Sequence, residues 1–72
     1  MFLEDVMLVT VNGKSSKIEK GTSLGELLLR LQIKRERVAT EVNMDIVPRA
    51  EYDSRILTDG DIIEIVQFVG GG

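Results

Sequence analysis

Residues 6–31 read VMLVTVNGKSSKIEKGTSLGELLLRL, and this stretch predicts a β-hairpin followed directly by a helix. The run at 6–11 is rich in β-branched residues, which favour strands. Asn12-Gly13 comes next, and this pair favours the type I′ turn, whose positive φ angles match the twist of a hairpin. The return strand at 14–19 is mostly polar, so we expect it at the edge of a sheet.

A helix is predicted immediately after Lys20-Gly21. Ser23 and Glu26 have the spacing of a capping box, with Thr22 as the alternative cap. Gly25 in the first turn lowers helix propensity but permits the close approach of another backbone segment. Leucines spaced three and four residues apart form one apolar stripe, which we expect to cover a face of the sheet: Leu24, Leu27, Leu28 and Leu31.

Short strands and turns are predicted in the second half of the chain. In order, they are a solvated basic loop at 34–37, a strand at 38–43, a tight turn at Met44-Asp45, a short strand from Ile46-Val47 that Pro48 ends, an irregular segment at 49–57, a turn at 58–61 and a strand at 62–68. With the hairpin and the helix, the order is β-β-α-β-β-β, in which one helix packs across a mixed sheet of four to five strands.

This order is that of an α+β fold of the β-grasp, or ubiquitin-like, kind. We expect the first and last strands to lie side by side as a central parallel pair. Residues 1–69 then form a single domain that begins with an exposed lead-in, and Gly70–Gly72 form a flexible C-terminal tail.

The composition excludes several classes of function. The 72 residues include neither cysteine nor histidine, which removes thiol chemistry, zinc fingers and a histidine base. The net charge of -3 has the wrong sign for a nucleic-acid partner. No apolar run is long enough to span a membrane, and no signal segment opens the chain. We expect a cytoplasmic monomer without cofactor or metal, which other proteins act on and which is not itself an enzyme.

The three glycines at the C-terminus are the unusual feature of the chain. A frayed end would explain them, but a tail without side chains also lets a partner enzyme draw the final carboxylate into its own active site. A carboxylate becomes reactive when ATP adenylates it, because AMP is a good leaving group for a sulfur or amine nucleophile. We therefore predict that the carboxylate of Gly72 reacts and that Gly70 and Gly71 thread through the enzyme.

Partner enzymes must also bind the folded domain. If Ile63 and Ile65 are buried, alternation along the strand places its even-numbered residues on the outer face. An exposed Phe68 beside the tail suits a docking anchor, although it could instead fold back onto the domain. The residues predicted to dock are Phe68, Val66, Glu64, Leu8 and Ile46.

Other polar residues are interpreted as structural. Tyr52 lacks a companion base and is expected to pack in the core. Asp59 and Asp61 flank a turn glycine and are expected to bond the backbone there, not to hold a metal. Arg49 is expected to pair with Glu51 or Asp53, or to contact a partner.

Several motifs resemble the ThiS family, the sulfur carriers of thiamin biosynthesis. They are IVPRAEY at 46–52, LTDGD at 57–61 and IVQFVGGG at 65–72, supported by NGK at 12–14 and SLGELL at 23–28. The resemblance covers residues 7–72. The extra lead-in at 1–6 leaves open whether Met1 or Met7 is the native start.

The resemblance implies a cycle in which an E1-like enzyme (ThiF-type) uses ATP and magnesium to adenylate Gly72, a donor converts it to a thiocarboxylate, and thiazole synthase (ThiG-type) accepts the sulfur. The alternatives are a molybdopterin-type sulfur carrier, which typically has prolines before its glycines, a ubiquitin-like protein modifier, and a regulatory β-grasp module without chemistry.

Overall fold

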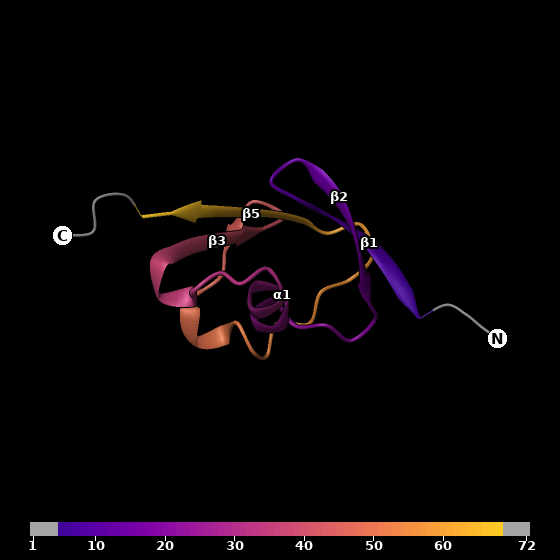
Figure 1. Ribbon diagram of the computed structural model, residues 1–72, viewed down its shortest axis with the longest axis horizontal. Coiled ribbons are helices and arrows are strands. Elements are labelled where there is room, and N and C mark those ends of the chain that lie inside the picture. Colours follow the sequence, from indigo (N-terminus) through magenta and orange to yellow (C-terminus); the bar gives the residue numbers. More distant parts are fainter. Residues whose placement is uncertain (1–4, 69–72) are drawn as a thin grey trace.

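The computed structural model describes residues 5–68 and shows a five-stranded sheet with one α-helix across one face (Figure 1). The strands are β1 (Val6–Val11), β2 (Lys14–Glu19), β3 (Val38–Val42), β4 (Asp45–Ile46) and β5 (Ile62–Gln67). The helices are α1 (Leu24–Arg30) and two short 3₁₀ helices, η1 (Arg35–Arg37) and η2 (Arg49–Glu51). The sheet order is β2-β1-β5-β3-β4, which confirms the predicted β-grasp arrangement.

The hairpin forms as predicted. β1 and β2 pair antiparallel from Val6↔Glu19 to Val11↔Lys14, and β2 lies at the edge of the sheet. Asn12 and Gly13 join them with φ angles of 49° and 84°, the left-handed conformation that a type I′ turn requires. β1 and β5 are parallel neighbours within the sheet, as expected of the first and last strands.

The capping box of α1 is confirmed, but the helix ends before the predicted stripe does. Ser23 Oγ accepts from the Glu26 N–H at 3.0 Å, and the Glu26 carboxylate accepts from the Ser23 N–H at 3.0 Å. Leu31 is 44% exposed, so its predicted place in the core was wrong. The reason is Gln32, whose φ of 61° turns the chain and lets the Ile33 N–H close the helix on Leu28 O at 2.9 Å.

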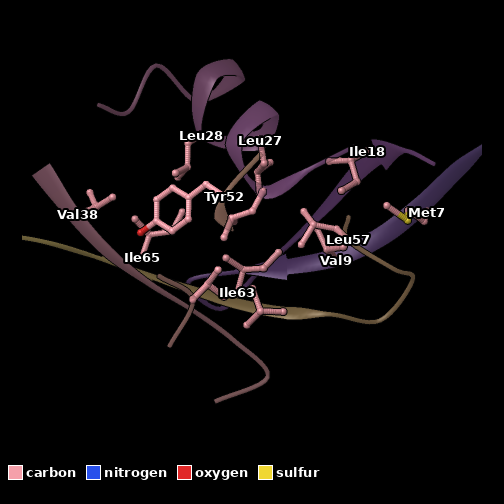
Figure 2. Close-up of a cluster of buried hydrophobic side chains, with 13 residues drawn as sticks. Met7, Val9, Ile18, Leu27, Leu28, Val38, Tyr52, Leu57, Ile63 and Ile65 are labelled. Carbon is pink, nitrogen blue, oxygen red and sulfur yellow. The ribbon is translucent and has the colours of Figure 1, made fainter. Parts of the chain in front are cut away.

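The core lies between α1 and one face of the sheet (Figure 2). The three remaining stripe leucines, Leu24, Leu27 and Leu28, are buried. Tyr52 is 2% exposed and donates a hydrogen bond to Thr40 Oγ1, so its interpretation as a packing residue is confirmed. The sheet and loops contribute the other members of the cluster: Met7, Val9, Ile18, Val38, Val42, Val47, Leu57, Ile63 and Ile65.

Gly25 makes room for a side chain, not for the close backbone approach that was predicted for it. Its N–H donates to Tyr52 O at 2.9 Å, and a Cβ there would collide with the Asp53 carboxylate. Asp53 is held by Arg35 through two hydrogen bonds of 2.9 and 3.0 Å. Arg49 therefore does not pair with Asp53, nor with any other acidic residue among the described residues. The basic segment is likewise not simply a solvated loop, because Arg35 ties η1 to the end of η2.

The turn between β3 and β4 lies one residue earlier than predicted. Asn43 and Met44 form it, with φ angles of 54° and 74°, so the short strand is Asp45–Ile46. The Asn43 side chain explains the position, because it donates to Asp61 at 2.9 Å and accepts from the Ile62 N–H at 2.9 Å. Within residues 5–68, no helix is long and apolar enough to cross a membrane.

Candidate functional site

β5 is the strand that leads toward the predicted reactive end of the chain. It lies between β1 and β3 at the centre of the sheet (Figure 1). Its residues Ile63 and Ile65 are buried against the core, at 0% and 8% exposure. The predicted reactive Gly72 and the threading residues Gly70 and Gly71 lie outside the described residues, so their roles stay predictions.

The outer face of the sheet, opposite α1, carries the predicted docking residues of β5. Glu64, Val66 and Phe68 are exposed and alternate with the buried isoleucines, which confirms the predicted faces of this strand. Val66 is 61% exposed and Phe68 is 56% exposed. Phe68 therefore does not fold back into the core, although its docking role stays a prediction.

The neighbouring strands extend this face sideways. Val66 is opposite Ala39 on β3, and Glu64 is opposite Glu41. Glu41 is in turn opposite Ile46 on β4, which is 72% exposed. Glu41 and Glu64 bring two carboxylates together, an unfavourable pairing across strands. No cation of the described part lies within ion-pair distance of either carboxylate.

Leu8 lies on the same outer face but near its other end. Its main-chain oxygen accepts from the Gly60 N–H at 2.7 Å, and its N–H donates to Asp59 at 2.8 Å, so it sits beside the turn that precedes β5. From that level to Val66 the chain advances about 20 Å, at the usual rise of a strand. The predicted docking residues thus do not form one cluster: Glu64, Val66 and Phe68 lie toward the C-terminal end, and Leu8 lies at the opposite end.

Two further residues of the outer face were missed. Ile62 is 49% exposed and Val6 is 50% exposed. The signal was present in the sequence, since Ile62 has the same parity as Glu64 along β5, and Val6 has the same parity as Leu8 along β1. With Leu8 they form an apolar area around the start of β5.

The acidic turn before β5 is a structural support, as interpreted from the sequence. Asp61 is 6% exposed and accepts from the Thr58 N–H at 2.8 Å, from the Thr58 hydroxyl at 3.0 Å and from Asn43 Nδ2 at 2.9 Å. Burial raises the pKa of Asp61, but these hydrogen bonds outweigh it and hold the pKa below its ordinary value. Among residues 5–68, no three acidic side chains gather where they could hold a metal ion.

Asn12 contributes more than the turn for which it was predicted. Its side-chain Oδ1 accepts from the Ile65 N–H at 2.7 Å, and its Nδ2 donates to Ile65 O at 3.1 Å. The amide thus imitates one more residue of β1 and holds the second half of β5. Spacing in the sequence gave no sign of this contact, because the two residues are 53 positions apart.

Comparison with known proteins gives consistent matches to this fold and sequence. The chain is 39% identical to sulfur carrier protein ThiS of Bacillus subtilis, over 90% of this chain and 100% of that protein. A crystal structure of a thiamine biosynthesis protein (ThiS) from Geobacter metallireducens superposes with a TM-score of 0.80 at 36% identity, covering 92% of this chain and 100% of that one.

The chain also matches part of a larger protein. It is 41% identical to a thiazole synthase of Magnetococcus marinus over 92% of its own length, but it spans only 20% of that relative. The model of the ThiS family matches residues 9–72, which include the glycines that end the sequence. The match covers most of the chain, so this protein belongs to the ThiS family.

Proposed function

We propose that this protein is a sulfur carrier for the thiazole part of thiamin, and that it is a substrate of other enzymes instead of a catalyst. The observation that carries the proposal is the family match, which runs from the β-grasp domain through Gly72. The fold supports it, because β5, the last strand before the glycines in the sequence, lies at the centre of the sheet between β1 and β3 (Figure 1).

The chemistry takes place at the Gly72 carboxylate in two steps. A carboxylate oxygen attacks the α-phosphorus of ATP, the bond to pyrophosphate breaks, and an acyl adenylate forms. Hydrosulfide then attacks the carbonyl carbon, a C–S bond forms as the C–O bond to AMP breaks, and a thiocarboxylate remains. The activating enzyme supplies the ATP site and its magnesium. We place the carrier in the cytoplasm, as a monomer when free.

Thiazole synthase is the proposed acceptor of the sulfur. The relative from Magnetococcus marinus supports this link, because a segment similar to this chain lies within a protein named thiazole synthase. We infer from this arrangement that the present chain serves the reaction of such a synthase. As the sulfur leaves, an oxygen nucleophile from the acceptor or from water attacks the carbonyl carbon, so Gly72 is again a free carboxylate and the carrier begins another cycle.

The partner enzymes bind the outer face of the sheet near the C-terminal end of β5. Val66 and Phe68 offer apolar contact next to the glycines in the sequence. The carboxylates of Glu41 and Glu64, which pair with no cation among residues 5–68, favour a cationic side chain on the enzyme. Ile46 extends the contact across β3 and β4. Leu8 lies too far along the face to belong to this contact, and we assign it a secondary role.

Adenylation by the activating enzyme tests the proposal. ATP–pyrophosphate exchange should depend on the carrier and should be lost when one alanine is added after Gly72, because the reacting carboxylate is then displaced. The melting temperature of the extended protein should equal that of the original. Exchange that continues unchanged with the extended protein would refute the assignment of Gly72.

A further inference from the structure

Along β5, the main-chain N–H and C=O groups of successive residues point alternately toward β3 and toward β1. On the β3 side, the Asn43 N–H donates to Ile62 O at 2.7 Å and the Phe68 N–H donates to Arg37 O at 2.9 Å. Main-chain groups alternate in direction along a strand in an antiparallel pair. The even-numbered residues of β5 therefore face β3, and the N–H and C=O groups of Ile63, Ile65 and Gln67 face the β1 side.

The β1 side of β5 is satisfied only as far as Ile65. The Asn12 N–H donates to Ile63 O at 2.9 Å, and the Asn12 side chain bonds both main-chain groups of Ile65. The chain then turns at Gly13 and returns as β2, so the hairpin ends before β5 does (Figure 1). Among the described residues, none bonds the main-chain N–H or C=O of Gln67 on this side.

The result is a short open edge on a strand that is otherwise central in the sheet. Gln67 is exposed and still lies within β5, where β3 holds it opposite Val38. A strand residue with a free N–H and a free C=O is the arrangement that accepts an extended segment of another chain. Because β3 fixes the strand, a partner finds these two groups already in position.

The sequence beyond this edge indicates which partner uses it. The last three residues are glycines, which offer no side chain to an enzyme. An enzyme that holds such a tail must therefore bond to main-chain groups, and an extended segment running beside the tail meets Gln67 as the last residue of β5.

We propose that an extended segment of the adenylating enzyme adds as a strand to the open edge of β5 and bonds the N–H and C=O of Gln67. The inference rests on the proposed function and adds the way in which the tail is aligned. Four residues lie between Gln67 and Gly72, so these two residues are at most about 18 Å apart. Fixing Gln67 therefore sets how far the carboxylate reaches into the enzyme, so Gln67 is a positioning residue.

The substitution Gln67→Pro tests the open edge of β5 directly. Gln67→Pro removes the N–H that faces the open side and keeps the β3 side intact, because that N–H has no partner there. Val66 before it is already extended, as a residue before proline must be. We expect an unchanged melting temperature and a rise of about fivefold or more in the KM for the carrier in ATP–pyrophosphate exchange, the value of one lost hydrogen bond.

Two matched variants separate the main chain from the side chain. Gln67→Ala keeps the main-chain N–H, so its KM should rise much less than that of Gln67→Pro. Val66→Pro removes an N–H that faces β3 and should lower the melting temperature. This result would show that proline destabilises β5 where it removes an N–H that is hydrogen-bonded within the sheet. If Gln67→Pro has the KM of the original protein, the added strand is wrong while the proposed function stands. If the original protein supports no exchange, both fall.

Amide hydrogen exchange gives a second measurement that needs no variant. The Gln67 amide should exchange fast in the free carrier, whereas the Phe68 amide, which bonds Arg37 at 2.9 Å, is slower. Bound to the activating enzyme, the Gln67 amide should become protected by at least about tenfold. A Gln67 amide that is protected already in the free carrier, or that stays unprotected in the complex, would overturn the inference.

Discussion

The hydroxyl of Tyr52 donates a hydrogen bond to Thr40 Oγ1 at 3.1 Å inside the core. Tyr52 follows η2 and Thr40 lies in the middle of β3, at 2% and 0% exposure. This bond ties the irregular segment before β5 to the sheet. It also satisfies two polar groups that burial would otherwise make costly.

Tyr52 and Thr40 should be coupled, so that removing both partners of this bond costs less than the two separate losses added together. Tyr52→Phe and Thr40→Val should each lower the free energy of unfolding by about 1–2 kcal/mol, because each leaves a buried hydroxyl without its partner. The double variant should be less destabilised than the sum of the two. Urea unfolding of the four proteins measures this coupling, and strictly additive losses would contradict it.

Asp61 makes stability depend on pH in the acid range. The pKa of Asp61 is lower in the folded chain than in the unfolded chain, where it is about 4. The ionised carboxylate therefore contributes fully to the free energy of unfolding above pH ~4. This contribution is lost as the pH falls through the pKa of the folded chain. We expect Asp61→Asn to be less stable at pH 7, by about 1–3 kcal/mol. The difference should shrink below pH ~4, as protonation removes the same charge from the original protein.

Asp53 provides the control for this pH dependence. Its hydrogen bonds with Arg35 also lower its pKa, but the pair is exposed to solvent. We expect Asp53→Asn to change the acid stability curve less than Asp61→Asn does. An equal or larger effect of Asp53→Asn would show that Asp61 is not the main source of the loss of stability in acid.

Phe68→Asp should weaken binding to the activating enzyme without unfolding the domain. Phe68 is 56% exposed beside the tail, so an anchoring role predicts a loss of at least ~2 kcal/mol, or about thirtyfold in Kd, with little change in melting temperature. Leu8→Asp is the matched control, because Leu8 is 51% exposed at the other end of the same face. Equal losses at the two positions would place the contact over the whole face.

A substitution at Gly71 distinguishes the two proposed functions, a sulfur carrier and a protein modifier. A side chain at this position should block entry of the tail into a narrow channel, so Gly71→Leu should stop growth without thiamin, and added thiazole should restore it. A carrier is not joined to lysines, so a blot of the tagged protein under reducing, denaturing conditions should show one band. A ladder in the original strain that disappears in the variant would establish conjugation instead.

The fold was predictable because its signals are local. The Asn12-Gly13 turn, the Ser23–Glu26 capping box and the alternation of β5 each lie within a few residues and agree with the tertiary structure. The misplaced end of α1 has a different origin, because Gln32 adopts a left-handed conformation for which no glycine or asparagine gave warning.

The contacts that shape the candidate site were not predictable in the same way. Asn12 bonds Ile65, and Arg35 bonds Asp53, which was one of the alternative partners expected for Arg49. Each contact joins segments that only the assembled fold brings together, so neither spacing nor composition reports it. Alternation along each strand predicted which face of the sheet the proposed docking residues occupy. It did not predict how far apart they lie along that face, because the distance of Leu8 from Val66 depends on the parallel register of β1 and β5.

The mass of the intact protein isolated from cells tests the central claim most directly. Cells that are making thiamin should contain a fraction of the carrier that is heavier by the exchange of one oxygen for sulfur, located by fragmentation at the carboxyl group of Gly72. That fraction should be absent from cells that lack the activating enzyme. A single species of unmodified mass in both strains, or sulfur found elsewhere in the chain, would contradict the assignment of this protein as a sulfur carrier.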